Sequence, residues 1–303
     1  MIFKFIAGVD KIVKFGSLKI YAMLEKPRYI NLGGKLMDLN TPRVMGIMNI
    51  TPDSFYKGSR YNTEKEIIDS ARKMISEGAD IIDVGGYSSR PGAEDIPQEV
   101  EADRVLKAIK LIKKEIPGAA VSVDTFRGEL ARRAVAECGA DMINDISGGE
   151  ADREMFSVVR SLNIPYVMMH MKGNPRTMQD NPVYDDIVYD ILKWLGERIF
   201  RLRSMGVNDI IIDPGFGFGK TVAHNFELLR RLDELSIAGL PLLVGLSRKS
   251  MIWKTLNIKA DEALNGTTAL NAVALINGAD ILRCHDVREA VQTIRLIKNI
   301  RNS

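Results

Sequence analysis

Eight times along the chain, a short apolar run is followed by a longer amphipathic segment, and few folds are compatible with that alternation. The expected strands span Arg43–Ile50, Asp80–Val84, Ala119–Asp124, Asp141–Ile146, Pro165–His170, Asp209–Asp213, Leu240–Gly245 and Ala279–Arg283. The expected helices span Thr63–Glu77, Pro97–Lys114, Gly128–Cys138, Asp152–Leu162, Tyr184–Ser204, Val222–Leu235, Ala260–Asn277 and Val287–Ile300. Such alternation favours parallel strands with right-handed crossovers, and eight units in about 250 residues are typical of a (β/α)8 barrel. An open doubly wound sheet is the alternative, and it normally has fewer strands.

Three of these units share the sequence Gly–Ala–Asp, in EGADIIDVGG, CGADMINDIS and NGADILRCHD. In each copy the glycine stands where a helix is expected to end, which suits a helix C-cap, and a strand follows at once. The shared sequence supports a repeated helix-to-strand unit.

A glycine pair precedes the first unit. From Tyr29 the chain reads YINLGGKLMDLN, in which two short β-like runs flank Gly33–Gly34 and indicate a hairpin. The residues up to about Met23 are mildly amphipathic and carry no motif. We therefore expect an accessory extension over residues 1–28 and one α/β domain over residues 29–303, a TIM barrel with a short N-terminal hairpin.

The composition argues against several classes of protein. The formal net charge is +3, and no long basic run has interleaved aromatic residues, so nucleic-acid binding is not expected. Cys138 and Cys284 are the only cysteines, which excludes a disulfide framework and fits a reducing compartment. No segment has the length and apolarity of a membrane span, and no convincing signal-peptide core is present, so we expect a cytoplasmic protein.

In a barrel of this type the loops after the strands form the active site, so residues at the strand ends are the candidates. In chain order they are Asn49, Tyr87–Gly92, Asp124, Asn144, Asp145, His170, Asp213, Ser247–Ser250, Arg283 and His285. Taken singly, each has an ordinary structural explanation, because caps and ion pairs are common. Eight separate segments that deliver polar side chains to one barrel mouth predict a binding site there.

The residue types indicate the kind of ligand. Asp124, Asn144 and Asp213 suit a flat heterocycle with an amidine-like edge, because a carboxylate accepts two N–H groups. Residues with cationic character suggest a phosphate or diphosphate; they are Arg90, Lys249, Arg283 and His285. Asn49 is a candidate Mg²⁺ ligand, because magnesium needs few protein ligands when phosphates supply the others. Ser250 is placed to hold a carboxylate.

The segment DIIIDPGFGFGKT, residues 209–221, raises a different hypothesis, a phosphate-binding loop of the type G-x-x-x-x-G-K-[ST]. Pro214 stands where the first glycine of that loop belongs, and proline has no N–H to offer a phosphate. A nucleotide-hydrolysing loop is therefore the weaker interpretation. A nucleotide-hydrolysing loop predicts that replacement of Lys220 abolishes activity. A site formed by the strand ends of the barrel predicts a milder effect.

The ordered motifs of the chain resemble those of the dihydropteroate synthase family. They are MGIMNITPDSF (45–55), DVGGYSSRPGA (83–93), SVDT (122–125), INDISGG (143–149), MHMKGNPRTMQ (169–179), DPGFGFGKT (213–221), GLSRKS (245–250) and GTTALNAVALINGADILRCHD (266–286). The resemblance covers nearly the whole barrel. The TPDSF, SRPGA and SRKS segments together distinguish it from the related pterin-binding methyltransferases.

The resemblance implies a transferase of folate biosynthesis that condenses 6-hydroxymethyl-7,8-dihydropterin diphosphate with 4-aminobenzoate to give 7,8-dihydropteroate and diphosphate. The residues implied at the pterin are Asp124, Asn144, Asp213, Lys249 and Arg283. Those implied around the diphosphate and its Mg²⁺ are Asn49, Ser89, Arg90, Arg283 and His285. Those implied at the 4-aminobenzoate are Arg90, Pro91, Phe218 and Ser250. The catalytic residues implied are Asp124, Lys249 and Arg283.

The resemblance also implies a homodimer through the late barrel helices. A further hypothesis is that sulfonamides, which mimic 4-aminobenzoate, compete with it at the end of the site formed by Arg90, Pro91 and Ser250. This chain departs from the commoner family form, which has Glu and Thr where it has Tyr87 and Ser89. Two rival functions are a pterin-dependent methyltransferase, which predicts a corrinoid partner, and a non-catalytic pterin or nucleotide binder, which predicts binding without turnover.

Overall fold

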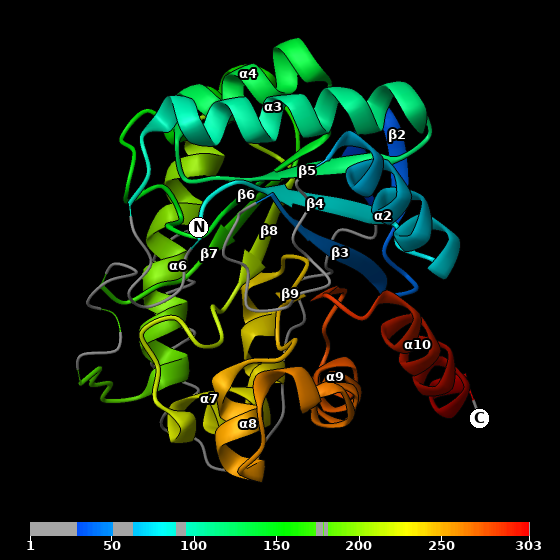
Figure 1. Cartoon of the computed structure of the whole chain (residues 1–303). Coiled ribbons are helices and arrows are strands. Elements are labelled where there is room, and N and C mark those ends of the chain that lie inside the picture. The colour runs from blue at the N-terminus through cyan, green and yellow to red at the C-terminus, as the bar shows by residue number, and fades with distance from the viewer. Residues whose placement is uncertain (1–28, 51–62, 89–94, 174–177, 179–180, 303) are drawn as a thin grey trace.

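The computed structural model describes residues 29–50, 63–88, 95–173, 178 and 181–302, which form a parallel barrel surrounded by helices, with a hairpin at one end (Figure 1). The hairpin consists of β1 (Tyr29–Leu32) and β2 (Lys35–Asp38), paired antiparallel. The predicted extension over residues 1–28 lies outside the described residues.

Eight parallel strands form the barrel. They are β3 (Arg43–Asn49), β4 (Ile81–Gly85), β5 (Ala120–Asp124), β6 (Met142–Asp145), β7 (Tyr166–Met169), β8 (Ile210–Asp213), β9 (Leu243–Val244) and β10 (Ile281–Cys284). Their order is β8-β7-β6-β5-β4-β3-β10-β9, and a parallel bridge between Ile212 and Leu242 closes the circle. The predicted TIM barrel with its hairpin is confirmed, and the open doubly wound sheet is wrong.

The helices lie outside the strands. They are α2 (Glu64–Glu77), α3 (Gln98–Glu115), α4 (Gly128–Cys138), α5 (Met155–Leu162), α6 (Ile187–Ser204), α7 (Val222–Arg230), α8 (Ser250–Leu256), α9 (Leu264–Ile276) and α10 (Val287–Asn302). The predicted capping box of the first helix is present, because Thr63 Oγ1 accepts from the Glu66 N–H and Glu66 accepts from the Thr63 N–H. No helix in these ranges is both long and apolar enough to cross a membrane.

Two predicted segments are shorter in the structure. The strand predicted over Leu240–Gly245 contains only Leu243–Val244, and Pro241, which has no N–H for the ladder, lies before it. The helix predicted over Val222–Leu235 is α7 followed by a 3-10 helix over Leu232–Ala238.

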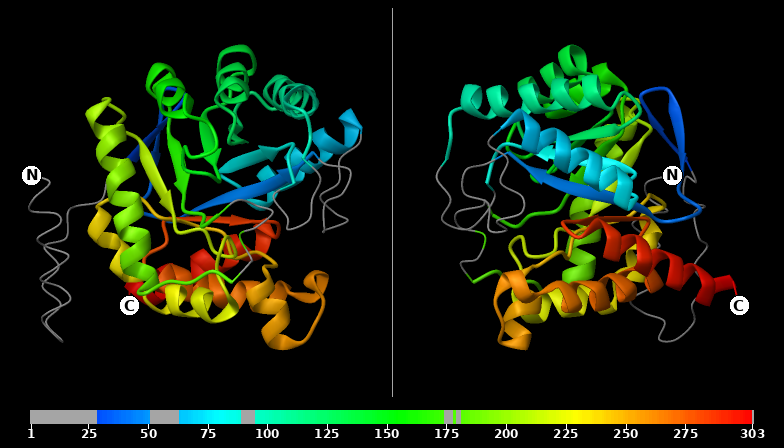
Figure 2. Two further views of the ribbon diagram at one scale, coloured as in Figure 1. Left: turned by 90° about the vertical axis from the view of Figure 1, so that its left-hand side faces the viewer. Right: turned by 45° about the vertical axis from the view of Figure 1, so that its right-hand side comes forward.

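One end of the barrel is filled by apolar side chains. Strand alternation sends every second side chain inward, and the first inward positions are Met45, Ile81, Ala120, Met142, Val167, Ile211, Leu243 and Ile281. Ile30 and Leu32 belong to the same cluster. The hairpin that carries them lies at this end of the barrel, where the strands begin (Figure 2). The opposite end, where the strands finish, is therefore the one available to a ligand.

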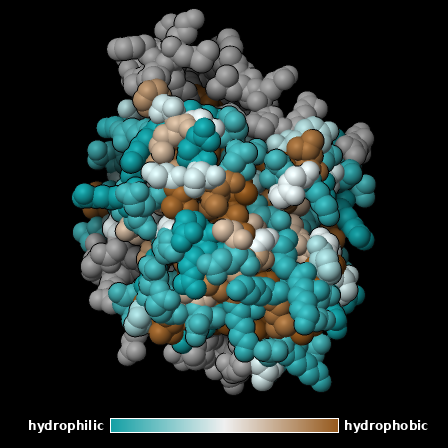
Figure 3. All heavy atoms as spheres, turned by 90° about the horizontal axis from the view of Figure 1, so that it is seen from above, coloured by the Kyte–Doolittle hydropathy of each residue, from teal (hydrophilic) through white to brown (hydrophobic). Residues whose placement is uncertain are grey.

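The outward side chains of the strands pack against the helices in a second, larger core. Seen from the side of α3 and α4, the outer surface is mostly hydrophilic, with small apolar areas between the charged side chains (Figure 3). The helices thus show the amphipathic pattern from which they were predicted.

The Gly–Ala–Asp repeat makes the same contact in all three copies. Its glycines, Gly78, Gly139 and Gly278, have φ of 101°, 74° and 98°, the left-handed conformation expected after a helix. Each aspartate accepts a hydrogen bond from a backbone N–H at the start of the preceding strand. These bonds join Val44 N to Asp80 (2.8 Å), Val121 N to Asp141 (2.8 Å) and Leu242 N to Asp280 (2.7 Å). The repeat therefore fastens neighbouring strands at the closed end of the barrel.

Candidate active site

Polar side chains occupy the barrel interior directly beyond the apolar end. Two residues further along each strand, five of the eight inward positions are polar: Asp83, Ser122, Asn144, Asp213 and Arg283. Asn49 and Asp124 end their strands beyond them, while β4 ends in Gly85, which has no side chain to fill the space. Most of the predicted site residues are thereby brought to one barrel mouth.

Arg283 joins two carboxylates across this interior. Its Nε donates to Asp83 Oδ2 at 2.6 Å, and its Nη2 donates to Asp124 Oδ2 at 2.5 Å. Asn144 Nδ2 also donates to Asp83 Oδ2, at 2.9 Å. Burial lowers the pKa of Arg283, but the two carboxylates outweigh this effect and raise it. The guanidinium therefore stays charged and is held in one orientation.

Asp83 was not among the sequence candidates. It is fully buried in the middle of the apolar strand IIDVG and not at its end. The sequence did contain an indication that Asp83 belongs to the site. A carboxylate inside an otherwise apolar strand needs a partner, and Asp83 lies two residues before Gly85, on the same side of the strand.

Asp124 has an unusual acidity. Burial raises the pKa of its carboxyl to about 7; Arg283 opposes this shift, and Asp83 adds to it. A carboxyl group with this pKa can exchange a proton near neutral pH.

Asp213 and Lys249 form the opposite wall of the mouth. Asp213 Oδ1 accepts from the Gly215 N–H at 2.7 Å, and burial raises its pKa while Lys249 lowers it. Lys249 Nζ donates to the Phe216 carbonyl and lies 4.7 Å from the centroid of the Phe218 ring. Burial lowers the pKa of Lys249 to about 8, against the opposing effect of Asp213.

Phe218 belongs to an apolar cluster next to these groups. Its other members are Phe126, Ile146, Met169, Met171 and Met178. Phe126 also packs edge-on against Tyr87, with ring centroids 5.0 Å apart. This apolar cluster extends along the loops that follow β5 to β8.

His285 is less basic than its grouping with the cationic residues implied. Burial, reinforced by Arg283, lowers its pKa to about 4, so its imidazole is neutral near neutral pH. Its Nδ1 lies 2.9 Å from Ser247 Oγ, and that hydroxyl accepts from the His285 N–H at 3.1 Å. His285 therefore offers a hydrogen bond and not a charge.

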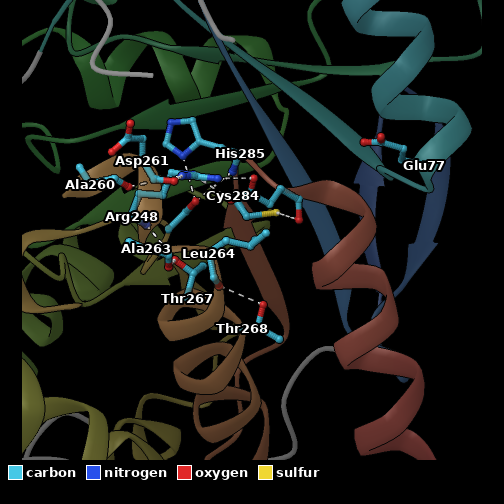
Figure 4. Close-up of polar contacts among 12 residues, drawn as sticks. Glu77, Arg248, Ala260, Asp261, Ala263, Leu264, Thr267, Thr268, Cys284 and His285 are labelled. Carbon is cyan, nitrogen blue, oxygen red and sulfur yellow. Dashed lines mark hydrogen bonds and ion pairs between the residues drawn. The ribbon is translucent and has the colours of Figure 1, made fainter. Parts of the chain in front are cut away.

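The loop that carries Lys249 and Ser250 is fixed by Arg248, which lies beside Ala260, Asp261 and His285 (Figure 4). Arg248 makes two hydrogen bonds to the carboxylate of Asp286, at 3.0 and 2.8 Å, with little of either side chain exposed. It also donates to the carbonyls of Ala260 and Asp261. Because its φ is 55°, the chain turns here so that the next residue, Lys249, enters the site.

Two polar residues predicted at strand ends do not face the mouth. Asp145 points outward and accepts from the Tyr166 hydroxyl, the Ser147 N–H and hydroxyl, and the Gly149 N–H. His170 lies buried beside Lys220, 3.0 Å from its Nζ. Both side chains serve the structure around the site.

The phosphate-loop interpretation of residues 209–221 is contradicted by the geometry. Lys220 is 2% exposed, and its Nζ donates to the carbonyls of Gly215 (2.9 Å) and Phe218 (3.0 Å). Thr221 Oγ1 accepts from the His224 N–H and caps α7. Neither side chain is directed at a ligand.

Ser89, Arg90, Pro91 and Gly92 lie outside the described residues. Asn49 ends β3 and is half-buried. Within the ranges that the structure describes, no group of three or more His, Cys, Asp or Glu side chains is arranged to hold a metal ion.

Known proteins resemble this chain in sequence and in structure. Residues 45–285 match the family model of pterin binding enzymes. Dihydropteroate synthase from Escherichia coli (strain K12) is 42% identical over 267 residues, which are 88% of this chain and 94% of that protein. The crystal structure of Yersinia pestis dihydropteroate synthase with a sulfonamide drug complex has a TM-score of 0.87 and 38% identity, covering 91% and 100% of the two chains. Xanthomonas albilineans dihydropteroate synthase with 4-aminobenzoic acid has a TM-score of 0.83 and 37% identity, covering 91% and 99%.

Proposed function

The chain belongs to the dihydropteroate synthases of the pterin-binding enzyme family, and we propose that the polar cluster at its barrel mouth binds and activates the pterin diphosphate. The enzyme is a transferase that condenses 6-hydroxymethyl-7,8-dihydropterin diphosphate with 4-aminobenzoate, forming 7,8-dihydropteroate and diphosphate. The observation that carries the assignment of residues is the pairing of Arg283 with Asp83 and Asp124, opposite Asp213 and Lys249, in one buried interior.

The pterin ring is proposed to lie between these two groups. The Asp213 carboxylate accepts the two N–H groups of the amidine-like edge, and Asn144 and Lys249 hydrogen-bond the remaining ring edge. Two buried oxygens support a polar ligand or water here. Asp83 Oδ1 and Ser122 Oγ have no hydrogen-bond partner within the described part of the chain.

The reaction breaks the C–O bond between the pterin methylene and the diphosphate, which leaves with the electron pair. The pterin delocalises the resulting methylene cation, and the Asp124 carboxylate stabilises it electrostatically. The aniline nitrogen then forms the new C–N bond and loses a proton. Asp124 is suited to accept that proton, because burial raises its pKa to about 7. The guanidinium of Arg283 packs on the ring and faces the departing charge.

The diphosphate end of the site is proposed to include Ser89, Arg90 and the neutral donor His285. Asn49 fits a Mg²⁺ that the substrate carries with it, because it brings a hard carbonyl oxygen to the mouth and the described residues form no acidic cage. When bound, Mg²⁺ supplies charge neutralisation on the leaving group. The protein residues orient the diphosphate so that it departs away from the pterin.

The 4-aminobenzoate is proposed to bind at the outer rim. Ser250, the first residue of α8, offers its hydroxyl to the carboxylate, with Arg90 and Pro91 opposite. Phe218 provides an apolar wall for the benzene ring. The aniline nitrogen is then directed toward the pterin methylene.

We also propose a homodimer and a cytoplasmic location, with residues 29–303 as the catalytic unit and residues 1–28 as an accessory extension. Apolar side chains on α9 and α10 support the dimer, because Ile276, Leu296 and Ile300 are 59%, 65% and 66% exposed. Sedimentation velocity of an Ile276→Glu, Leu296→Glu variant tests this surface, and an unchanged sedimentation coefficient would count against it.

Diphosphate release from the pterin diphosphate with Mg²⁺, measured with and without 4-aminobenzoate, tests the proposed site. We expect release to depend on 4-aminobenzoate and to fall at least a hundredfold in Asp213→Ala, on the order expected for loss of a buried charged hydrogen bond. Asp209→Ala, at the other end of the same strand, is the matched control and should retain activity. Equal losses in both variants would refute the placement, and pterin binding without turnover would favour a non-catalytic binder.

A further inference from the structure

Lys220 is a buried ionisable residue that the reaction scheme does not use. It is 2% exposed, and burial holds its pKa well below the ordinary value of a lysine, against the opposing effect of Asp213. Burying an amine in this way is costly unless its donors are satisfied. Its partners therefore indicate what the residue does.

The Nζ of Lys220 gathers the glycine-rich turn onto the end of β7. It donates to the Gly215 and Phe218 carbonyls at 2.9 and 3.0 Å. It also lies 3.0 Å from His170 Nδ1. The turn is pressed against β7, because a Cβ at Gly215, where φ is 71°, would lie 1.9 Å from the His170 carbonyl oxygen. Lys220 and His170 thus hold the turn on the side that faces β7.

The same turn also contacts Lys249. The Phe216 carbonyl accepts from Lys249 Nζ, and the Phe218 ring lies 4.7 Å from it. A Cβ at Gly217 would lie 3.2 Å from Lys249 Cδ, so the turn also packs along the lysine stem. Lys249 thus contacts the same stretch of the turn that Lys220 binds. Phe216 lies between the two carbonyls that accept from Lys220, and Phe218 carries one of them.

We propose that Lys220 is a positioning residue for the pterin, which acts through the turn to place Lys249 beside Asp213. This inference rests on the proposed function, because it assigns Lys249 to the pterin ring. It gives the GKT sequence a purpose unrelated to phosphate binding. The lysine organises carbonyl oxygens inside the protein, whereas a phosphate-loop lysine reaches outward to the nucleotide.

Calorimetric binding of two ligands separates these roles. The ligands are 6-hydroxymethylpterin and 6-hydroxymethylpterin diphosphate with Mg²⁺, which differ only in the diphosphate. We expect Lys220→Met to weaken both by the same factor, roughly ten- to hundredfold, because the Gly215 and Phe218 carbonyls lose their donor. A loss confined to the diphosphate would overturn the inference and make Lys220 a phosphate ligand, and unchanged binding of both would also overturn it.

A double-mutant cycle tests whether Lys220 acts through Lys249. If it does, Lys220→Met should weaken pterin binding much less in a Lys249→Met background than in the wild type, because coupled residues are not additive. Additive losses would overturn the inference. If Lys220→Met does not fold, His170→Leu removes one partner of Lys220 and should give a smaller, equal loss for both ligands; an unequal loss or none would overturn it. Failure of the wild-type protein to bind either ligand would instead refute the proposed function.

Discussion

Arg283 of β10 and Asp83 of β4 meet inside the barrel, where the guanidinium Nε donates to the carboxylate at 2.6 Å. Asp83 is fully buried, and the same oxygen accepts from Asn144 at 2.9 Å. One carboxylate thus orients two of the residues assigned to the pterin. It holds them before any substrate arrives, which is how a preorganised site avoids reorganisation during the reaction.

Replacement of Asp83 should therefore damage catalysis chiefly by freeing Arg283 and Asn144, the two residues that it orients. We expect Asp83→Ala to lower kcat/KM for the pterin diphosphate by about two to four orders of magnitude, because breaking a buried ion pair costs about 3–5 kcal/mol. Asp83→Asn keeps an acceptor and should fall between the wild type and Asp83→Ala. Steady-state kinetics and urea unfolding, measured together, separate the effect on the site from the effect on stability.

Asp145 provides the matched control, because it is equally buried but points outward. Asp145→Asn should lower the free energy of unfolding and leave the KM for the pterin diphosphate unchanged. If Asp145→Asn raised that KM as much as Asp83→Ala, both residues would be general stabilisers, and the assignment of Asp83 to the site would fail.

The pH dependence of kcat/KM should be bell-shaped. Asp124 must be ionised to stabilise the cation, so activity rises as the pH increases through its pKa of about 7. Lys249 must be protonated to donate to the pterin, so activity falls as the pH rises through its pKa of about 8. Lys249→Arg should move the alkaline decline in activity to higher pH, since a guanidinium stays charged. An alkaline limb that stays in place in this variant would assign the limb to another group.

The barrel was predictable because its alternation is strong and repeated, and the strand-end rule then located Asp124, Asn144, Asp213, Lys249 and Arg283. The inward or outward direction of a side chain was harder to predict. Asn144 and Asp145 are adjacent, yet one faces the site and the other faces Tyr166. Parity changes with each residue, so an uncertainty of one position in a strand boundary reverses the assignment.

Long-range pairing was not predictable from local pattern. Asp83 has its partner Arg283 200 positions later in the chain, and the partner of Lys220 is His170, 50 positions earlier. No periodicity encodes such contacts, because they depend on how the strands are arranged in the barrel. Burial in the assembled barrel lowers the pKa of His285, and the local sequence pattern does not reveal that burial.

Sulfonamides should compete with 4-aminobenzoate, because both molecules carry an aniline at one end and a negatively polarised group at the other. The proposed contact predicts that Ser250→Ala raises the KM for 4-aminobenzoate and the inhibition constant of the sulfonamide together, about ten- to hundredfold, as for one hydrogen bond to a charged group. Thr255→Ala, later in α8, where the hydroxyl bonds the Met251 carbonyl, is the control. Noncompetitive inhibition, or a shift in only one of the two constants, would contradict a shared position at Ser250.

The Gly–Ala–Asp contacts should support stability and not catalysis, because they lie at the closed end of the barrel. Asp141 accepts from the Val121 N–H at 2.8 Å and from Lys113 Nζ at 2.6 Å, and both donors are largely buried with it. Asp141→Ala leaves them without this acceptor, so we expect the free energy of unfolding to fall by about 1–3 kcal/mol.

The kinetic constants of the folded Asp141→Ala variant should equal those of the wild type, because strand alternation separates the two ends of the barrel. Urea unfolding and steady-state kinetics on the same preparation check both expectations. Glu129→Ala removes an exposed ion pair with Arg132 on α4 and should change stability much less. A large rise in KM for either substrate in Asp141→Ala would show that the closed end of the barrel affects substrate binding at the mouth. That outcome would contradict the expectation that one end serves stability and the other catalysis.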